Sequence, residues 1–425
     1  TTWPALSDHV FTITNSGTTP LTISAVTTNG SHPSDFIVVS GPAASIAVGA
    51  KAVFTLRFNP SVLGLRSATV HILSDDVTEA DYDFALQGTG VEPEIAVLGT
   101  NGAVIADGDA VPSTADGTDF GALRMWNGTA NPTKDHVFTI TNSGAVVLNV
   151  FGVTTNGAVP SDFTVITGPA TNVAAGAATT FTVRFDPSAL GLRAATVHVL
   201  NDDETEADYD FALQGTGIEP DMHALGTNLA LIASGDATPQ LADGTDFGSA
   251  RIYDSSTTTT TLVERVFMIT NSGSATLAIS STTTSGAHQA DFTLTSLPAA
   301  SLAPGATTTF RVLFNPSAVG LRSANLHLAN DDFYHATNYT FAIQGTGIEP
   351  EIAILGTNLA LIANGDLAPA VADGTDFGLA HETTGYVDRV FTITNQGSAI
   401  LYITGVTTNG THPSDFTMTA GPSTS

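Results

Sequence analysis

The sequence predicts an all-β protein built from tandem β-sandwich domains, and three observations support that prediction. Apolar and polar residues alternate with a period of two over many short segments, as they do in strands that bury one face. Turn-forming clusters such as TNSG, PSD and FNPS separate these segments. The whole pattern returns about every 127 residues, and no stretch as long as a typical helix shows helical periodicity.

The segment AVFTLRF shows the alternation most clearly. Phe54, Leu56 and Phe58 share one face of the predicted strand, while Thr55 and Arg57 lie on the other. The corresponding apolar residues of the next copy are Phe181, Val183 and Phe185. A sheet with one apolar face must cover it with a second layer, so each unit is predicted to be a sandwich with its own core.

Long sequence landmarks define the repeat. The motif VFTITNSG begins at Val10 and returns, with small changes, at Val137, Val266 and Val390. The motif FNPSVLGLRSATVHI begins at Phe58 and returns at Phe185 and Phe314. Solenoid repeats are far shorter than this period, so each unit should be a whole domain.

Composition limits the classes of partner. The chain has 425 residues, with 40 Asp plus Glu against 12 Lys plus Arg, and a formal net charge of −28. Such a surface repels nucleic acids and anionic membranes but attracts divalent cations, so no nucleic acid partner is predicted. The absence of cysteine excludes disulfides, thiolate zinc sites and cysteine nucleophiles. No apolar run approaches the ~20 residues that span a bilayer, so no membrane insertion of this segment is predicted.

Spaced positions along the whole chain carry a family resemblance. The order DFG, VFTITNSG, LTI, DF, RFNPS, RSATV and QGTG resembles the immunoglobulin-like repeats of the ASH/HYDIN type. Within that group the chain is most similar to bacterial choice-of-anchor D domains, which end in NDxxE…YxFxxxGTG. The matching residues here are Asn201, Asp202, Tyr209, Phe211 and Gly215 to Gly217, and Glu204 stands one position before the glutamate of that motif. The resemblance implies immunoglobulin-like sandwiches in a secreted or surface-exposed structural protein, and it carries over no catalytic residue.

The resemblance also sets the domain frame, in which each unit ends with GTG. Residues 91–217 and 218–347 are predicted to be complete immunoglobulin-like domains. Residues 1–90 are predicted to lack the opening segment of a domain, and residues 348–425 its final strands. A sandwich without those strands exposes apolar faces and unpaired edges. Two explanations stay open: the sequence is an excerpt of a longer chain, or the edges pair with another subunit.

The recurring stretch FALQGTGVEPEIAVLGTN, which begins at Phe84, contains closely spaced glycines that raise the question of a phosphate-binding loop. A G-x-G-x-x-G fingerprint needs a third glycine and a following helix, but here Pro93 stands at that position and a strand is predicted next. We interpret the stretch as a joint, whose glycines adopt backbone angles that other residues resist and whose proline stiffens the entry. The predicted joint residues are Gly88, Gly90, Pro93, Gly215, Gly217, Pro220, Gly345, Gly347 and Pro350.

Acidic loops are the candidate metal sites. Calcium takes about six to eight oxygen ligands, mostly from flexible acidic loops, and is the one cofactor considered. The candidate ligands are Asp109, Asp116, Asp119, Asp236, Asp243, Asp246, Asp366, Asp373 and Asp376. The alternative is that these residues form turns, in which Asp side chains accept hydrogen bonds from nearby backbone N–H groups. Both interpretations stay open.

An arginine recurs in the motif GLR, at Arg66, Arg193 and Arg322, although cations are scarce in this chain. We expect each arginine to pair with an acid. The candidate acids are the joint glutamates Glu92, Glu219 and Glu349. Such a pair would set the angle between domains and would not take part in chemistry.

These features predict a structural protein and not an enzyme, because an enzyme usually has one site whereas each motif here recurs. The predicted function is a repeat protein of the bacterial cell surface or extracellular space, which forms a semi-rigid rod and self-assembles into a filament. The alternatives are an adhesin stalk whose ligand-binding domain lies outside this segment and a carbohydrate-binding accessory module. Self-association is the expected interaction, with surface glycans as a second class of partner. Sequons that permit glycosylation begin at Asn29, Asn127, Asn338 and Asn409.

Overall fold

The computed structural model describes residues 7–126, 128, 130–252 and 262–423. These residues form β-strands and short 3₁₀ turns, which confirms the prediction of tandem β-sandwiches. Contacts divide the chain into two compact units, Thr1–Met125 with Asn131–Gly217 and Trp126–Ala130 with Ile218–Ser425. No described segment forms a helix with the length and apolarity needed to cross a bilayer.

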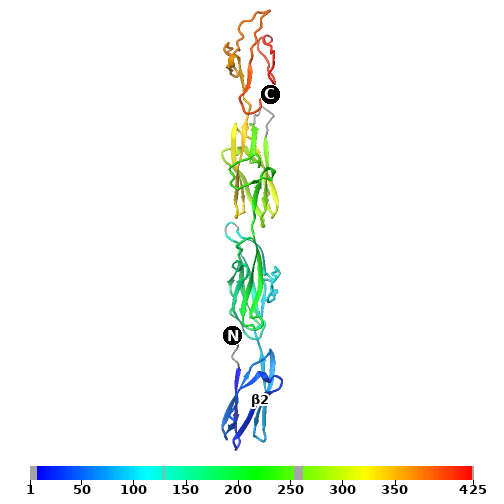
Figure 1. Ribbon diagram of the computed structural model, residues 1–425, viewed down its shortest axis with the longest axis vertical. Coiled ribbons are helices and arrows are strands. Elements are labelled where there is room, and N and C mark those ends of the chain that lie inside the picture. Colours follow the sequence, from blue (N-terminus) through cyan, green and yellow to red (C-terminus); the bar gives the residue numbers. More distant parts are fainter. Residues whose placement is uncertain (1–6, 127, 129, 253–261, 424–425) are drawn as a thin grey trace. The chain divides into compact units, whose positions relative to one another are not determined.

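The strands between residues 91 and 218, called here the 91–217 sandwich, form two five-stranded sheets, drawn in cyan to green in Figure 1. One sheet contains, in spatial order, β13 (Phe163–Thr167), β15 (Ala178–Phe185), β11 (Lys134–Asn142), β8 (Ile95–Leu98) and β9 (Val104–Ile105). The other contains β10 (Asp119–Arg124), β17 (Asp208–Ile218), β16 (Gly191–Asn201), β12 (Leu148–Asn156) and β14 (Asn172–Val173).

The next sandwich, called the 218–347 sandwich, repeats this topology. One sheet contains β19 (Leu231–Ile232), β18 (Met222–Leu225), β21 (Val263–Asn271), β25 (Thr307–Phe314) and β23 (Phe292–Ser296). The other contains β20 (Asp246–Arg251), β27 (Asn338–Ile348), β26 (Gly320–Asn330), β22 (Leu277–Ser285) and β24 (Ser301–Leu302). Strand β20 runs parallel to β27, whereas β26 and β27 are antiparallel.

Fewer strands are present at the two ends of the described chain. The 1–90 sandwich has one sheet of β1 (Ser7–Thr14), β5 (Lys51–Phe58) and β3 (Phe36–Ser40). Its other sheet contains β4 (Ser45–Ile46), β2 (Leu21–Asn29), β6 (Gly64–Ser74) and β7 (Asp81–Gly90), with β2 labelled in Figure 1. After residue 348 there is a single sheet of β29 (Leu361–Ile362), β28 (Ile352–Leu355) and β30 (Thr392–Asn395).

Short 3₁₀ turns recur at two places in the repeat. One turn directly precedes a strand in three sandwiches: η1 (Pro33–Asp35) precedes β3, η2 (Pro160–Asp162) precedes β13 and η4 (Gln289–Asp291) precedes β23. The same turn recurs as η6 (Pro413–Asp415) near the end of the described chain. Those that follow β18 and β28 are η3 (Thr227–Leu229) and η5 (Thr357–Leu359). The predicted domain boundaries stay a prediction, but each sheet takes its strands from one predicted domain apart from Ile218 and Ile348, which end β17 and β27.

Each complete sandwich encloses a core drawn from both of its sheets. Phe138 and Phe181 are partners across β11 and β15 and stack at 5.4 Å. The Phe211 ring from the opposite sheet lies 5.4 Å from that of Phe138. All three side chains are fully buried, as the alternating pattern of the sequence predicts for the inward face.

The 1–90 sandwich leaves two strand edges uncovered among the described residues. Strands β1 and β7 end their sheets, whereas the corresponding β11 and β17 pair with β8 and β10. Phe58 is only half-buried, whereas its counterpart Phe185 is fully buried beneath a contact with Phe120 of β10. The opening segment of a domain therefore completes both the edges and the core.

Candidate functional site

The predicted joint residues lie at the end of one sandwich and the start of the next. Gly215 and Gly217 belong to β17, and Pro220 stands between its last residue, Ile218, and Met222, the first residue of β18. The corresponding glycines Gly88 and Gly90 lie in β7, and Gly345 and Gly347 lie in β27. The corresponding prolines Pro93 and Pro350 precede β8 and β28. The joint is therefore mostly strand, with a very short link.

The glycines of the joint are required by close packing and not by unusual backbone angles. None of the six has the positive φ that the sequence argument assigned to them, so that expectation is wrong. A Cβ atom on Gly215 would lie 2.6 Å from the ring of Phe185, and one on Gly217 would lie 2.3 Å from the carbonyl oxygen of Ala189. Larger residues would push the core ring or the neighbouring backbone aside.

The asparagine of the TNSG motif attaches the joint to the sandwich that follows it. Asn142 is 1% exposed, and its Oδ1 accepts hydrogen bonds from the backbone N–H groups of Glu94 and Gly144. Its Nδ2 donates to the carbonyl oxygens of Val146 and Val173, at 2.7 and 2.9 Å. The hydrogen bond to the joint recurs in the next two units, where Oδ1 of Asn271 accepts from the N–H of Asp221 and Oδ1 of Asn395 accepts from the N–H of Glu351. The sequence interpretation treated TNSG only as a turn signal.

The recurring arginines bind aspartates, so the expected pairing with the joint glutamates is wrong. Arg193 Nε donates to Oδ2 of Asp162 at 2.6 Å, and the Asp162 side chain is 1% exposed. The equivalent pairs are Arg66 with Asp35 and Arg322 with Asp291. Each pair ties the 3₁₀ turn to the strand that starts with GLR. Each aspartate precedes its arginine by 31 residues, but the joint glutamates recur as regularly after it, so the spacing alone does not single out the partner.

The loop aspartates of the 91–217 sandwich accept hydrogen bonds within turns. Oδ1 of Asp109 accepts from the N–H of Val111, and Oδ1 of Asp116 accepts from both the N–H and the hydroxyl of Thr118. Oδ1 of Asp119 accepts from Gly121 N–H at 2.7 Å, and its Oδ2 accepts from Gln214 Nε2 of β17 at 2.9 Å.

The other predicted loop aspartates repeat these contacts. Turn hydrogen bonds of the same kind are accepted by Asp236, Asp243, Asp246, Asp366, Asp373 and Asp376. In the part of the chain that the structure describes, no group of three candidate metal ligands includes any of these nine residues. The turn interpretation accounts for these contacts, and calcium binding at the loops stays a prediction.

An acidic cluster lies close to the start of β8. Burial raises the pKa of Glu92, and the charges of Asp203, Glu94 and Glu204 raise it further. Burial likewise raises the pKa of Glu206, with added repulsion from Asp203, Asp107 and Glu94. Ionising either glutamate therefore opposes folding.

Replacing Glu206 with glutamine is expected to stabilise the 91–217 sandwich at pH 7. A carboxyl whose pKa is raised by folding favours the folded state fully only below its unfolded-state pKa, about 4.3, and loses this effect as the pH rises through its folded-state pKa. The gain should therefore shrink toward zero in acid. Thermal unfolding measured from pH 3 to pH 8 checks this, with Glu79→Gln, at an exposed residue outside this cluster, as the control for a simple loss of charge. An equal effect of both variants at every pH would contradict the burial argument.

Comparison with known proteins adds a family match for part of the chain. Residues 242–346 match a family model described as a HYDIN/CFA65/VesB-like, Ig-like domain. A search of curated proteins finds no relative. The family match supports immunoglobulin-like repeats, and the finer likeness to choice-of-anchor D domains stays a prediction.

Several solved structures are similar to the chain at low identity. A protein of unknown function from Porphyromonas gingivalis W83 is 14% identical, with 51% of this chain and 91% of that chain covered and a TM-score of 0.21. The secreted serine protease VesC from Vibrio cholerae is 10% identical, with 78% and 73% covered and a TM-score of 0.21. Extracellular cadherin domains 1–5 of protocadherin gamma B2 are 9% identical, with 79% and 55% covered and a TM-score of 0.30.

Proposed function

We propose that the chain is a structural repeat segment of a bacterial cell-surface or extracellular protein, in which tandem sandwiches act as a semi-rigid spacer. The observation that carries the proposal is the recurrence of the same stabilising contacts in successive sandwiches. The buried Arg–Asp pair occurs in three sandwiches, and the hydroxyls of Tyr209 and Tyr339 donate to the carbonyl oxygens of Ile105 and Ile232 at corresponding positions. Repetition of structural contacts suits a spacer, whereas an enzyme needs one differentiated site.

The short joint supports limited bending. Three residues, 219–221, separate the end of β17 from the start of β18. The carbonyl oxygen of Glu219 accepts hydrogen bonds from Ser274 and Ala275, and the N–H of Asp221 donates to Asn271. A link of this length with its backbone groups bonded to the following sandwich has little freedom compared with a flexible linker.

Self-association through sheet edges is the second part of the proposal. Strands β1 and β7 of the 1–90 sandwich present edges that β8 and β10 cover in the 91–217 sandwich. An uncovered edge has backbone groups ready to pair with another strand. Strands equivalent to β8 and β10, supplied by a second copy of the chain, would cover these edges and join chains end to end.

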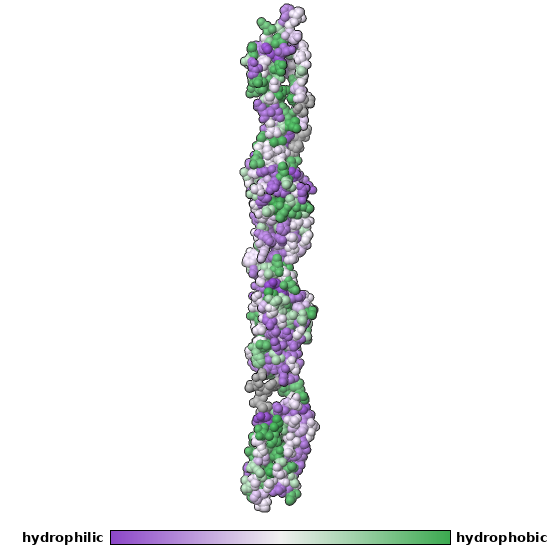
Figure 2. All heavy atoms as spheres, in the orientation of Figure 1, coloured by the Kyte–Doolittle hydropathy of each residue, from purple (hydrophilic) through white to green (hydrophobic). Residues whose placement is uncertain are grey.

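A carbohydrate-binding role would be favoured by a row of exposed aromatic side chains. In the described part of residues 91–217, the exposed large aromatic residues are Trp126, which follows β10 outside any strand, and Phe151 of β12. On the face shown in Figure 2, hydrophobic residues are interspersed with hydrophilic ones. Within residues 91–217, this distribution favours the spacer over a carbohydrate-binding platform. Of the sequons, Asn29, Asn338 and Asn409 are exposed, and Asn127 lies outside the described residues.

Negative-stain microscopy of the purified chain, with and without a calcium chelator, tests the proposal. Long uniform fibres are expected. An added peptide of residues 91–124, which contains β8 to β10, should shorten them by covering the edges of the 1–90 sandwich, whereas a scrambled peptide should not. Separate short particles would contradict self-assembly, and fibres that persist after chelation would exclude calcium as the bridging agent. Globular particles without elongation would contradict the spacer role.

A further inference from the structure

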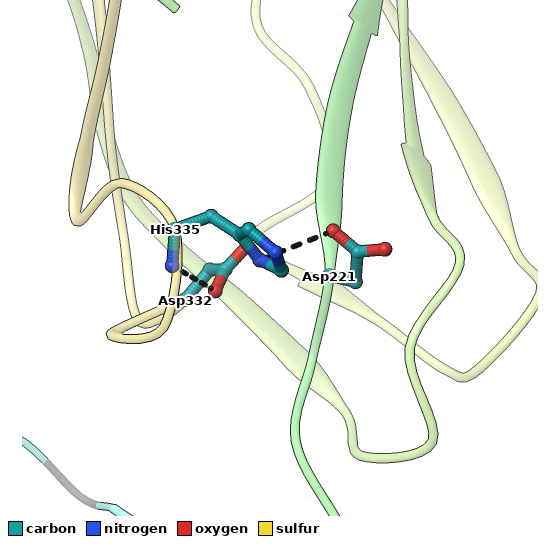
Figure 3. A group of neighbouring side chains, drawn as sticks. All are labelled: Asp221, Asp332 and His335. Carbon is teal, nitrogen blue, oxygen red and sulfur yellow. Dashed lines mark hydrogen bonds and ion pairs between the residues drawn. The ribbon is translucent and has the colours of Figure 1, made fainter.

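A mixed cluster of carboxylates and imidazole occurs in the 218–347 sandwich. Asp221 immediately precedes β18, while Asp332 and His335 belong to the loop between β26 and β27. Figure 3 shows the three side chains converging from these two segments, which lie more than 100 residues apart in the sequence. One ligand-type atom of each residue lies within 4.8 Å of the others.

The distances in this cluster suit ligands of a shared ion better than hydrogen bonds. His335 Nδ1 lies 3.4 Å from Asp221 Oδ1 and 3.4 Å from Asp332 Oδ2. Hydrogen bonds between such groups are usually about 2.7–3.2 Å long. Two ligand atoms that are each about 2.1 Å from a tetrahedral ion are about 3.4 Å apart.

The carboxylates are held in place by other groups, which leave one oxygen without a donor. Asp332 is 1% exposed, and its Oδ2 and Oδ1 accept hydrogen bonds from the N–H groups of Met222 and His335. Oδ2 of Asp221 accepts from the Ser272 hydroxyl at 2.7 Å and lies 3.3 Å from Nε2 of His223. Oδ1 of Asp221, which faces His335, is buried and accepts no hydrogen bond among the described residues. A buried carboxylate oxygen without a donor is costly unless a cation neutralises it.

We propose that Asp221, Asp332 and His335 form a binding site for a divalent transition-metal ion of the zinc type, with a water molecule as the fourth ligand. Calcium and magnesium prefer oxygen ligands alone, whereas zinc readily accepts imidazole nitrogen together with carboxylate oxygen. The bound ion would link the first strand of the sandwich to the β26–β27 loop. The site therefore acts on the stability of one sandwich, independently of the spacer role and of self-association.

The 91–217 sandwich provides an internal comparison. The corresponding carboxylates are Glu94 and Asp203, but the loop after Asp203 is one residue shorter. Thr205 takes the place of His335 there, because its N–H donates to Asp203 Oδ1 as that of His335 donates to Asp332 Oδ1, so the imidazole is missing. Asp203 keeps the structural role of its counterpart, because its Oδ2 accepts a hydrogen bond from the N–H of Ile95. Zinc binding is therefore expected at one sandwich and not at its neighbour.

Binding of Zn²⁺ to the full chain, measured by isothermal titration calorimetry, and of Co²⁺, measured by absorption spectroscopy, tests the site. One tight equivalent of zinc and a cobalt spectrum of tetrahedral type are expected. His335→Ala and His335→Glu should each abolish both signals, and they should fold because the His335 side chain is 59% exposed. His198→Ala is the matched control, because His198 also pairs with an aspartate, Asp208. Among the described residues, no group of three candidate metal ligands includes His198.

Asp221→Asn gives a second measurement that does not disturb the buried Asp332. It should weaken zinc binding strongly while leaving the circular dichroism spectrum unchanged. Unchanged stoichiometry in His335→Ala, or an equal loss in His198→Ala, would overturn the proposal, because the ion would then bind to surface histidines in general. Absence of a tight equivalent in the unsubstituted chain would also overturn it.

Discussion

Replacing Phe185 with alanine is expected to lower the free energy of unfolding of the 91–217 sandwich by about 3–5 kcal/mol. The Phe185 side chain is fully buried, stacks on Phe163 at 4.9 Å and lies 5.7 Å from Phe120. It also covers Gly215, where the missing Cβ makes room for the ring. Alanine would leave a cavity bounded by rigid strands from both sheets, which can collapse only in part.

Hydrogen exchange of the full chain, followed by mass spectrometry, measures this effect locally. Amides of β11, β15 and β16 should exchange faster in Phe185→Ala, while those of β21, β25 and β26 in the 218–347 sandwich should be unchanged. Phe151→Ala is the control, because that side chain is 63% exposed and its removal should cost little. Faster exchange in both complete sandwiches would show that they do not unfold independently. Equal effects of the two variants would contradict the packing argument.

Replacing Asp162 with alanine is expected to cost about 3 kcal/mol, because it leaves the guanidinium of Arg193 without its partner. The Asp162 side chain is 1% exposed and that of Arg193 15%, so neither charge is well solvated. Asp135→Ala is the matched control. This substitution breaks the ion pair between Asp135 and Arg184, whose side chains are 38% and 40% exposed. It should cost only about 0.2–1 kcal/mol. Chemical denaturation of the full chain with both variants gives the comparison, and equal costs would show that burial is unimportant.

The contribution of Asp162 should also depend on pH. Burial raises the pKa of this carboxyl, but the hydrogen bonds from Arg193 and Ser188 outweigh burial and lower the pKa below its ordinary value. A carboxyl whose pKa is lowered by folding stabilises the protein above its unfolded-state pKa, about 3.9, and this stability is lost as the pH falls through the folded-state pKa. The difference between the unsubstituted chain and Asp162→Ala should therefore be full at pH 7 and shrink below about pH 4. A difference that stays constant into strong acid would contradict an ionic origin.

Local pattern predicted the strands and their buried faces well. Phe181, Val183 and Phe185 alternate with polar residues, and all three are fully buried in β15. Because the sequence repeats, the same alternation of buried and exposed residues was predicted for β5 and β25, and both strands show it. Period-two alternation is a property of the extended backbone itself, so a single strand suffices to reveal it.

The recurring polar residues were predicted less well. Asn142 and Asp162 both stand in motifs that were interpreted as turn signals, yet both are buried and bind segments 31 or more residues away. The joint glycines were attributed to backbone angles, although Gly215 is required because Phe185 packs against it. In each case the reason lies in a partner that the fold supplies from another part of the repeat.

By itself, the sequence determined the fold class and the repeat, because alternation, turn residues and periodicity act over neighbouring residues. Only the tertiary structure decided which acid binds Arg193, what Asn142 holds, and that Asp221 meets Asp332 and His335. The physical reason is that these contacts depend on which strands pair and how two sheets face each other. Side chains 31 to 114 residues apart then meet within a few ångströms, at distances that no local pattern encodes.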